Sequence, residues 1–218
     1  MNQVLALLRP HRIVPVVTAD SSGQAVAIAG ALADGGVPVA EITFRTAAAA
    51  DAIAAVAARG DVLVGAGTVV RPDQVDAAVD AGARFIVSPG TSRAVVERCR
   101  LRGVPVLPGA VTATEIQAAL ELGITTVKFF PAAASGGAAA LRALAAPFGE
   151  VTLVPTGGIG PDDLADYFAI PAVPAVGMSW MLPEAAVGAG DWAEVTRRTR
   201  RLVTLAGAPR SDAAAALR

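Results

Sequence analysis

Stretches with the hydrophobic spacing of a helix alternate along the chain with short apolar runs typical of buried strands. Ala-rich stretches with helical spacing end at glycine, and each is followed by a short run rich in Val and Ile, as in ADGGVPVAEITF and ELGITTVKFFP. Glycine just past a helix end allows the chain to reverse into a strand. The pattern predicts eight strands, near residues 12–18, 37–44, 61–66, 83–88, 104–108, 124–130, 151–155 and 173–178.

Helices are predicted in the intervals between these strands. Because the strands are apolar on both faces and no linker-like stretch divides the chain, the repeated unit favours a closed parallel barrel. We therefore expect an α/β fold, a (β/α)8 TIM barrel with a short N-terminal helix, and the alternative is an open doubly wound sheet. Residues 1–206 are expected to form one domain and residues 207–218 a flexible C-terminal tail. The predicted helices lie near residues 22–34, 47–59, 72–81, 92–102, 113–122, 137–145, 161–168 and 191–206.

Four consecutive strands are expected to end at proline, in SPG (88–90), LPG (107–109), FPA (130–132) and VPTGG (154–158). Proline cannot continue the hydrogen-bond ladder, so it marks the carboxyl end of each strand. In a barrel, that end carries the chemistry.

One strand carries an unexpected amine. Lys128 lies in the apolar run ITTVKFFP, and it is the only lysine among the 18 basic residues. An amine can lose its proton and attack a carbonyl, whereas a guanidinium stays charged. We expect desolvation beside Val127, Phe129 and Phe130 to favour the free amine.

The strand PVAEITFRT adds two further ionisable groups. Side chains alternate between the two faces of a strand, so Glu41 and Arg45 share the face opposite an all-apolar set. Lys128 has the corresponding position on its own strand, and all three groups are expected to face the barrel interior. We expect Glu41 to lie one water molecule away from Lys128 and to act as an acid and base. A structural ion cluster is the alternative interpretation.

Two glycine-containing loops suggest a site for an anion. Gly157 and Gly158 follow the seventh strand, and Gly177 and Ser179 stand where the eighth strand ends. Glycine lets backbone amides approach an anion, and the loops after strands seven and eight of barrels often bind phosphate. In the third strand exit, VGAGTV, Thr68 is available to a carboxylate.

Composition excludes several classes of function. A net charge of −1 and nine aromatic residues give no electrostatic footprint for nucleic acid or a membrane surface. Cys99 is the sole cysteine and His11 the sole histidine, which leaves too few ligands for a His/Cys metal site. A reducing cytoplasm fits best, and the N-terminus is not expected to be a signal peptide.

The motifs EITFRT, VGAGTV, VSPG, LPG, VKFFPA, PTGGI and GMSW, in this order, resemble the 2-keto-3-deoxy-6-phosphogluconate (KDPG) aldolase family. The resemblance runs from about residue 12 to residue 206. It implies a homotrimer of barrels without metal or cofactor, which cleaves 2-keto-3-deoxy-6-phosphogluconate to pyruvate and glyceraldehyde 3-phosphate through an imine. It also implies roles for nine residues: imine formation by Lys128, acid and base chemistry by Glu41, carboxylate binding by Arg45 and Thr68, a pyruvate pocket of Pro89 and Phe130, and phosphate binding by Gly157, Gly158 and Ser179. Gly177 is the tenth predicted site residue, from its place where the eighth strand ends.

One position departs from the family pattern, because GGSW is replaced by GMSW with Met178. If that glycine has a positive φ in the family, methionine would strain the loop and weaken phosphate binding. The sequence does not fix the stereochemistry at C4 of the sugar acid, so the epimeric 2-keto-3-deoxy-6-phosphogalactonate and 4-hydroxy-2-oxoglutarate remain candidate substrates. A phosphosugar isomerase or synthase that uses Lys128 as an anion anchor, and a non-catalytic binding barrel, remain as alternatives from other classes.

Overall fold

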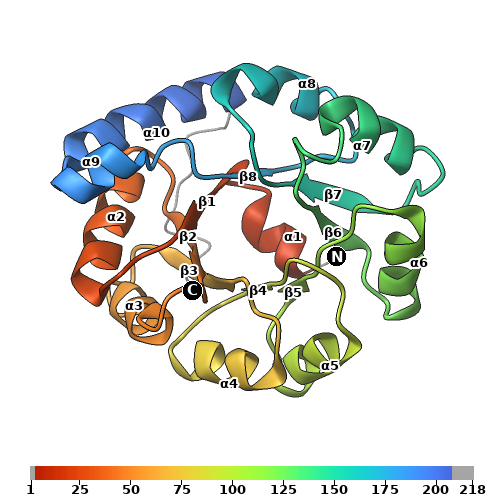
Figure 1. Ribbon diagram of the computed structural model, residues 1–218, viewed down its shortest axis with the longest axis horizontal. Coiled ribbons are helices and arrows are strands. Elements are labelled where there is room, and N and C mark those ends of the chain that lie inside the picture. Colours follow the sequence, from red (N-terminus) through yellow and green to blue (C-terminus); the bar gives the residue numbers. More distant parts are fainter. Residues whose placement is uncertain (1–2, 208–218) are drawn as a thin grey trace.

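Eight parallel strands form a closed ring in the computed structural model, which describes residues 3–207 (Figure 1). Six strands pair in the order β5-β4-β3-β2-β1-β8, and β6 pairs with β7. Parallel bridges join Gly109 to Lys128 and Thr156 to Gly177, which connects the two groups at both ends. The (β/α)8 barrel is confirmed and the open sheet is excluded. The strands are β1 (Ile13–Val17), β2 (Val39–Thr43), β3 (Leu63–Gly67), β4 (Ile86–Val87), β5 (Val106–Leu107), β6 (Thr126–Phe129), β7 (Thr152–Pro155) and β8 (Val176–Met178).

The helices surround the ring, except for α1 (Gln3–Leu8), which lies within it in the view of Figure 1. The short helix α9 was not predicted, because its sequence EAAVGA contains a glycine and resembles a loop. The outer helices are α2 (Ser22–Asp34), α3 (Ala49–Ala57), α4 (Pro72–Asp80), α5 (Arg93–Leu101), α6 (Ala113–Glu121), α7 (Gly137–Ala145), η1 (Pro161–Asp163), α8 (Leu164–Phe168), α9 (Glu184–Ala189) and α10 (Trp192–Ala206). The predicted tail lies outside the described residues from position 208 onward.

Local signals fix where the elements begin and end, and α6 shows how. The Thr112 side chain accepts a hydrogen bond from the backbone N–H of Glu115, whose carboxylate accepts from the N–H groups of Val111 and Thr112. This capping box satisfies amides that the first turn of a helix leaves free. After the helix ends, Gly123 at φ 67° reverses the chain toward β6. The same reversal sets the start of the strand that carries Lys128.

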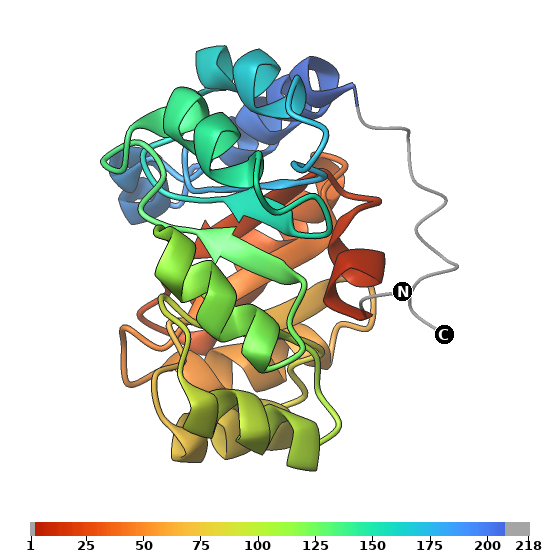
Figure 2. The same cartoon turned by 90° about the vertical axis from the view of Figure 1, so that its right-hand side faces the viewer.

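Two hydrophobic layers follow from the alternation of side chains along the strands. The outer layer, between strands and helices, includes Ala40 and Ile42 of β2. The inner layer fills the ring and includes Val39 of β2 together with Val4 and Leu8 of α1, both of which are fully buried. Figure 2 shows α1 at the side of the barrel where the strands begin. That end is closed by apolar side chains, so the opposite end is left for a site.

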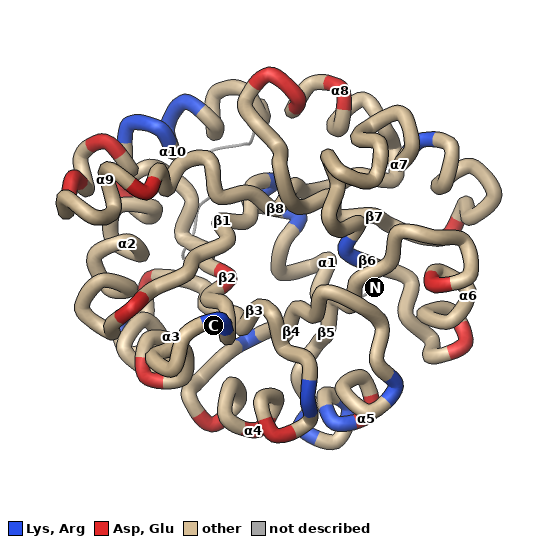
Figure 3. Tube along the Cα trace, viewed as in Figure 1, with Lys and Arg blue, Asp and Glu red and all other residues tan. Residues whose placement is uncertain are grey.

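Charged residues lie mostly on the outer helices (Figure 3). Glu41 and Lys128 are exceptions, because both project into the ring and are almost fully buried. Across residues 3–207, none of the helices combines the length and the apolar character needed to cross a bilayer.

His11 connects α1 to β1 and is 8% exposed. Its Nε2 atom has no hydrogen-bond partner among the described residues, and burial lowers the pKa of its imidazole. The unfolded chain, with a His pKa near 6.5, therefore binds more protons than the folded chain at mildly acidic pH.

We expect the free energy of unfolding to fall as the pH is lowered from about 7 to about 5, because His11 must then be protonated in a desolvated place. Urea denaturation at several pH values measures this slope. The variant His11→Gln should flatten it, since the chain has no other histidine and the carboxyl groups titrate mainly at lower pH. An unchanged slope in the variant would contradict the assignment.

Candidate active site

Lys128 and Glu41 meet inside the ring. Lys128 projects from β6 and Glu41 from β2, and the Lys128 Nζ atom donates a hydrogen bond of 3.0 Å to Glu41 Oε1. The two residues are 5% and 2% exposed. The predicted convergence of the two groups is therefore confirmed, and the pair is an ion pair shielded from bulk water.

Two details of the prediction for Lys128 were wrong. No water separates the two groups, because the long lysine side chain reaches across the ring to contact the carboxylate directly. Val127 and Phe129 do not surround the amine either, since both belong to the outer layer. Val127 and Phe129 are adjacent to Lys128 in the sequence, and successive residues of a strand face opposite sides. Phe130 does approach it, with its ring centroid 5.1 Å from Nζ.

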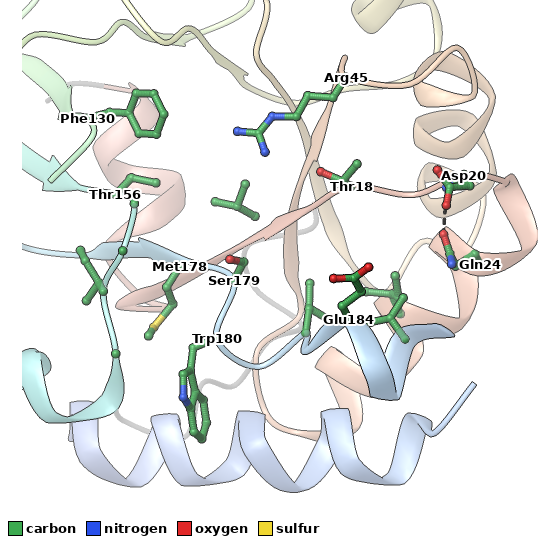
Figure 4. Close-up of a pocket in the computed structure, with 18 of the residues that line it drawn as sticks. Thr18, Asp20, Gln24, Arg45, Phe130, Thr156, Met178, Ser179, Trp180 and Glu184 are labelled. Atoms are coloured by element: carbon green, nitrogen blue, oxygen red, sulfur yellow. Dashed lines mark hydrogen bonds between the residues drawn. The ribbon is translucent and has the colours of Figure 1, made fainter. Parts of the chain in front are cut away.

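A cavity of about 940 Å³ is lined by residues at the ends of the strands, several of which Figure 4 labels. Lys128 is part of its wall. In Figure 4 the guanidinium of Arg45 points into the cavity, toward the side where Phe130 lies. Six of the ten predicted site residues line this space: Arg45, Lys128, Phe130, Gly157, Gly158 and Ser179. Glu41 lies directly behind them, in contact with Lys128.

Gly157 and Gly158 form the turn that follows β7. Their φ angles are +99° and +72°, a region that side chains rarely adopt. A Cβ atom on Gly157 would also lie 3.2 Å from the Phe130 ring, and one on Gly158 would lie 2.7 Å from the Cβ of Ala133. Glycine is thus required twice over at this turn, by conformation and by space, and the backbone is left open to the cavity.

The other three predicted residues, Thr68, Pro89 and Gly177, are not among the residues that line the cavity. Thr68 follows β3 with φ +57°, an unusual conformation for a β-branched residue and one that is often found at functional sites. The carbonyl oxygen of Pro89 packs on Gly109, where an added Cβ would come within 2.0 Å of it. Gly177 makes room for Thr156 in the same way, because a Cβ atom added to Gly177 would lie 2.4 Å from Thr156 Oγ1. The structure therefore shows a packing role for Gly177, and phosphate binding by it stays a prediction.

Comparison with known proteins identifies the family. The profile of KDPG and KHG aldolases matches residues 4–198. The chain belongs to this family. It is 47% identical over 208 residues to the 2-dehydro-3-deoxy-phosphogluconate aldolase of Treponema pallidum, covering 95% of this chain and 99% of the relative. It is 40% identical over 199 residues to the KHG/KDPG aldolase of Escherichia coli, covering 91% and 93%.

A solved structure of a related aldolase shows the same fold. The KDPG aldolase of Legionella pneumophila, with pyruvate captured at low pH as a covalent carbinolamine intermediate, has a TM-score of 0.87 and 36% identity. The match covers 90% of this chain and 96% of that one. The present chain is therefore an aldolase, a carbon–carbon lyase.

Met178 replaces a glycine of the family pattern without the strain that we expected. It is a residue of β8, paired with Pro15 of β1, and its side chain packs in the outer layer at 2% exposure. Within residues 3–207, only Arg12 and Thr68 among non-glycine residues have a positive φ. Met178 thus leaves the backbone of this strand exit in an ordinary conformation.

Sequence reasoning missed one wall of the aldolase cavity. Asp20 precedes α2 and Gln24 lies in its first turn, whereas Trp180 follows β8 and Glu184 is the first residue of α9. The Gln24 amide oxygen accepts a hydrogen bond from the Asp20 backbone, which fixes this loop. Thr156 could have been found, since it stands two residues after Val154, which faces the ring interior. No cluster of three or more His, Cys, Asp or Glu side chains suited to a metal occurs in residues 3–207.

Removing one partner of the Lys128 and Glu41 pair should destabilise the aldolase. We expect Lys128→Met to lower the free energy of unfolding by about 3 to 5 kcal/mol, because it leaves a buried carboxylate unpaired. The double variant Lys128→Met/Glu41→Gln should regain most of that loss, since neither remaining group is charged. Chemical denaturation measures both values, and a double variant no more stable than Lys128→Met would contradict this coupling.

Proposed function

We propose that this enzyme cleaves 2-keto-3-deoxy-6-phosphogluconate to pyruvate and glyceraldehyde 3-phosphate through an imine on Lys128. The observation that carries the proposal is the buried contact of 3.0 Å between Lys128 Nζ and Glu41 Oε1 at the wall of a cavity large enough for a sugar acid. An amine beside a carboxylate and shielded from water suits covalent attack on a keto group.

Imine formation would begin with proton transfer from Lys128 to Glu41, which is already within hydrogen-bond distance. The free amine attacks the C2 keto carbon, and the keto oxygen takes up the proton that the nitrogen loses, which gives a neutral carbinolamine. Glu41 returns a proton to the C2 hydroxyl, water departs, and a protonated imine remains. The related Legionella enzyme holds pyruvate as such a carbinolamine.

Cleavage then uses the protonated imine as an electron sink. Removal of the C4 hydroxyl proton by Glu41 lets the C3–C4 bond break, which releases the aldehyde and leaves an enamine on Lys128. Glu41 gives the proton to C3, and water hydrolyses the resulting imine to pyruvate and the free amine. Each step moves a proton to or from one carboxylate, so a single well-placed acid and base suffices.

The cavity offers complementary walls for the two ends of this substrate. Arg45 and Thr68 are proposed to bind the carboxylate, and Pro89 and Phe130 to surround the pyruvate part. Gly157, Gly158, Gly177 and Ser179 are proposed to bind the phosphate, and the open backbone of the turn after β7 supports this. Guanidinium groups and backbone amides are the usual partners of carboxylates and phosphates.

4-Hydroxy-2-oxoglutarate is a second candidate substrate, because the relative from Escherichia coli is named KHG/KDPG aldolase. The same imine chemistry applies to it, but it is shorter, ends in a carboxylate at C5 and has no phosphate. The galactonate epimer differs only at C4 and needs no change in the catalytic residues.

We also propose that the enzyme is a cytoplasmic homotrimer of single-domain subunits that needs no metal or cofactor, as the family resemblance implies. Leu101 is 78% exposed on α5 and offers an apolar contact for such an assembly.

Borohydride reduction in the presence of pyruvate tests the imine. We expect a stable mass increase of one reduced pyruvate unit on Lys128, located by peptide mass spectrometry. Lys128→Arg keeps the charge but cannot form the imine, so it should lose the label and at least about 1,000-fold in kcat. Folded wild-type enzyme without label, or appreciable turnover by Lys128→Arg, would favour a role of Lys128 as a fixed cation, as in an isomerase.

Ser179→Ala tests the phosphate wall. We expect KM for the phosphorylated substrate to rise about tenfold with little change in kcat, because one hydrogen bond to a charged group is worth about 1.5 kcal/mol or more. Cleavage of 4-hydroxy-2-oxoglutarate should be unaffected. Equal losses with both substrates would place Ser179 outside phosphate binding.

A further inference from the structure

We propose that Gly67 is a positioning residue that holds the carboxylate of Glu41 in line with Lys128 because it has no side chain. This inference rests on the imine mechanism proposed above and concerns a residue of β3 that does not itself touch the reacting atoms.

The side chain of Glu41 fills the space beside the Cα atom of Gly67. A Cβ atom added to Gly67 would lie 2.4 Å from Glu41 Oε1, 2.7 Å from its Cγ and 2.9 Å from its Cδ. Two non-bonded heavy atoms of these types normally stay more than 3 Å apart. The Glu41 side chain therefore occupies the space that any larger residue at position 67 would need.

Conformation does not explain this glycine. Gly67 is the last residue of β3, aligned with Thr43 of β2, and its carbonyl oxygen accepts a hydrogen bond from the backbone of Phe44. It is not among the glycines of residues 3–207 that have positive φ, so alanine could adopt its backbone geometry. The remaining reason for glycine is the space that it leaves to the neighbouring strand.

The position of the Glu41 carboxylate relative to Lys128 depends on the space beside Gly67. In the described chain its carboxylate has one side-chain hydrogen-bond partner, the Lys128 amine at 3.0 Å. The oxygen that accepts this hydrogen bond, Oε1, is also the atom nearest to the missing Cβ of Gly67. A side chain at position 67 would displace that oxygen by a substantial fraction of an ångström, and misplacement of about 1 Å can cost roughly 100-fold in rate.

A second glycine of β3 provides a matched comparison. Gly65 stands two residues earlier and so points to the same interior face, but its added Cβ would meet the Phe85 ring at 2.3 Å. Phe85 belongs to the inner hydrophobic layer. Gly65→Ala is therefore a packing variant on the same strand, whereas Gly67→Ala acts on the catalytic carboxylate.

The test compares Gly67→Ala and Gly65→Ala in the wild-type and Glu41→Ala backgrounds. The measurements are kcat and the exchange of pyruvate methyl protons with deuterated solvent, which follows proton transfer at C3. Gly67→Ala should lower both by about 100-fold in the wild-type background. In the Glu41→Ala background, where the crowded atoms are absent, it should change them by less than about threefold. Gly65→Ala should have the same effect in both backgrounds.

Stability measurements keep the test decisive if Gly67→Ala folds poorly. The double variant with Glu41→Ala should then recover the melting temperature, because the Cγ, Cδ and Oε1 atoms are gone. Gly149→Ala, which meets nothing within 4 Å, is the neutral control.

Three results would overturn the inference: an active Gly67→Ala enzyme, an equal loss in both backgrounds, or a double variant that remains unfolded. Wild-type enzyme that neither exchanges protons nor takes the borohydride label would instead overturn the imine mechanism, and the inference with it.

Discussion

The hydrogen bond between Lys128 and Glu41 is the constraint on which the site depends. Two ionisable groups removed from water are costly unless each satisfies the other, and here they lie 3.0 Å apart at 5% and 2% exposure. They come from β6 and β2, which are far apart in the strand order of the ring. The closed barrel brings these two strands face to face across the ring, so the buried pair depends on closure of the sheet.

Absent side chains shape the site as much as present ones. Glycines of β3, of the turn after β7, and of β8 each leave space for a neighbouring side chain: Gly67 for Glu41, Gly157 for Phe130 and Gly177 for Thr156. Packing a side chain against bare backbone restricts its rotamers without adding a polar group that would compete for its hydrogen bonds. The glycines at the ends of the strands therefore restrict the movement of side chains such as Glu41, whose position the proposed chemistry requires to be fixed.

Much of this arrangement could be predicted from local patterns. The alternation of faces in PVAEITFRT and ITTVKFFP places Glu41 and Lys128 in the interior, and the glycines between helix and strand delimit the eight units. The same rule, applied strictly, also removes Val127 and Phe129 from the surroundings of the amine. The direct contact between Lys128 and Glu41 could not be predicted, because it depends on the width of the ring and on the space left by Gly67. The wall with Asp20 and Glu184 was missed because loop conformation depends on contacts between distant segments.

The basic and the acidic residues around the cavity lie on different walls. Arg45 and Lys128 stand on the side of the ring interior, and the carboxylates of Asp20 and Glu184 stand on another wall, as Figure 4 shows for the labelled residues. A keto acid phosphate carries an anionic group at each end, and a carboxylate wall repels both. In the proposed binding mode the carboxylate lies at Arg45 and the phosphate at the neutral backbone of Gly157 and Gly158, away from that wall. The proposed imine on Lys128 requires this orientation, because the keto carbon is next to the carboxylate that Arg45 would hold, and the charges of the walls agree with it.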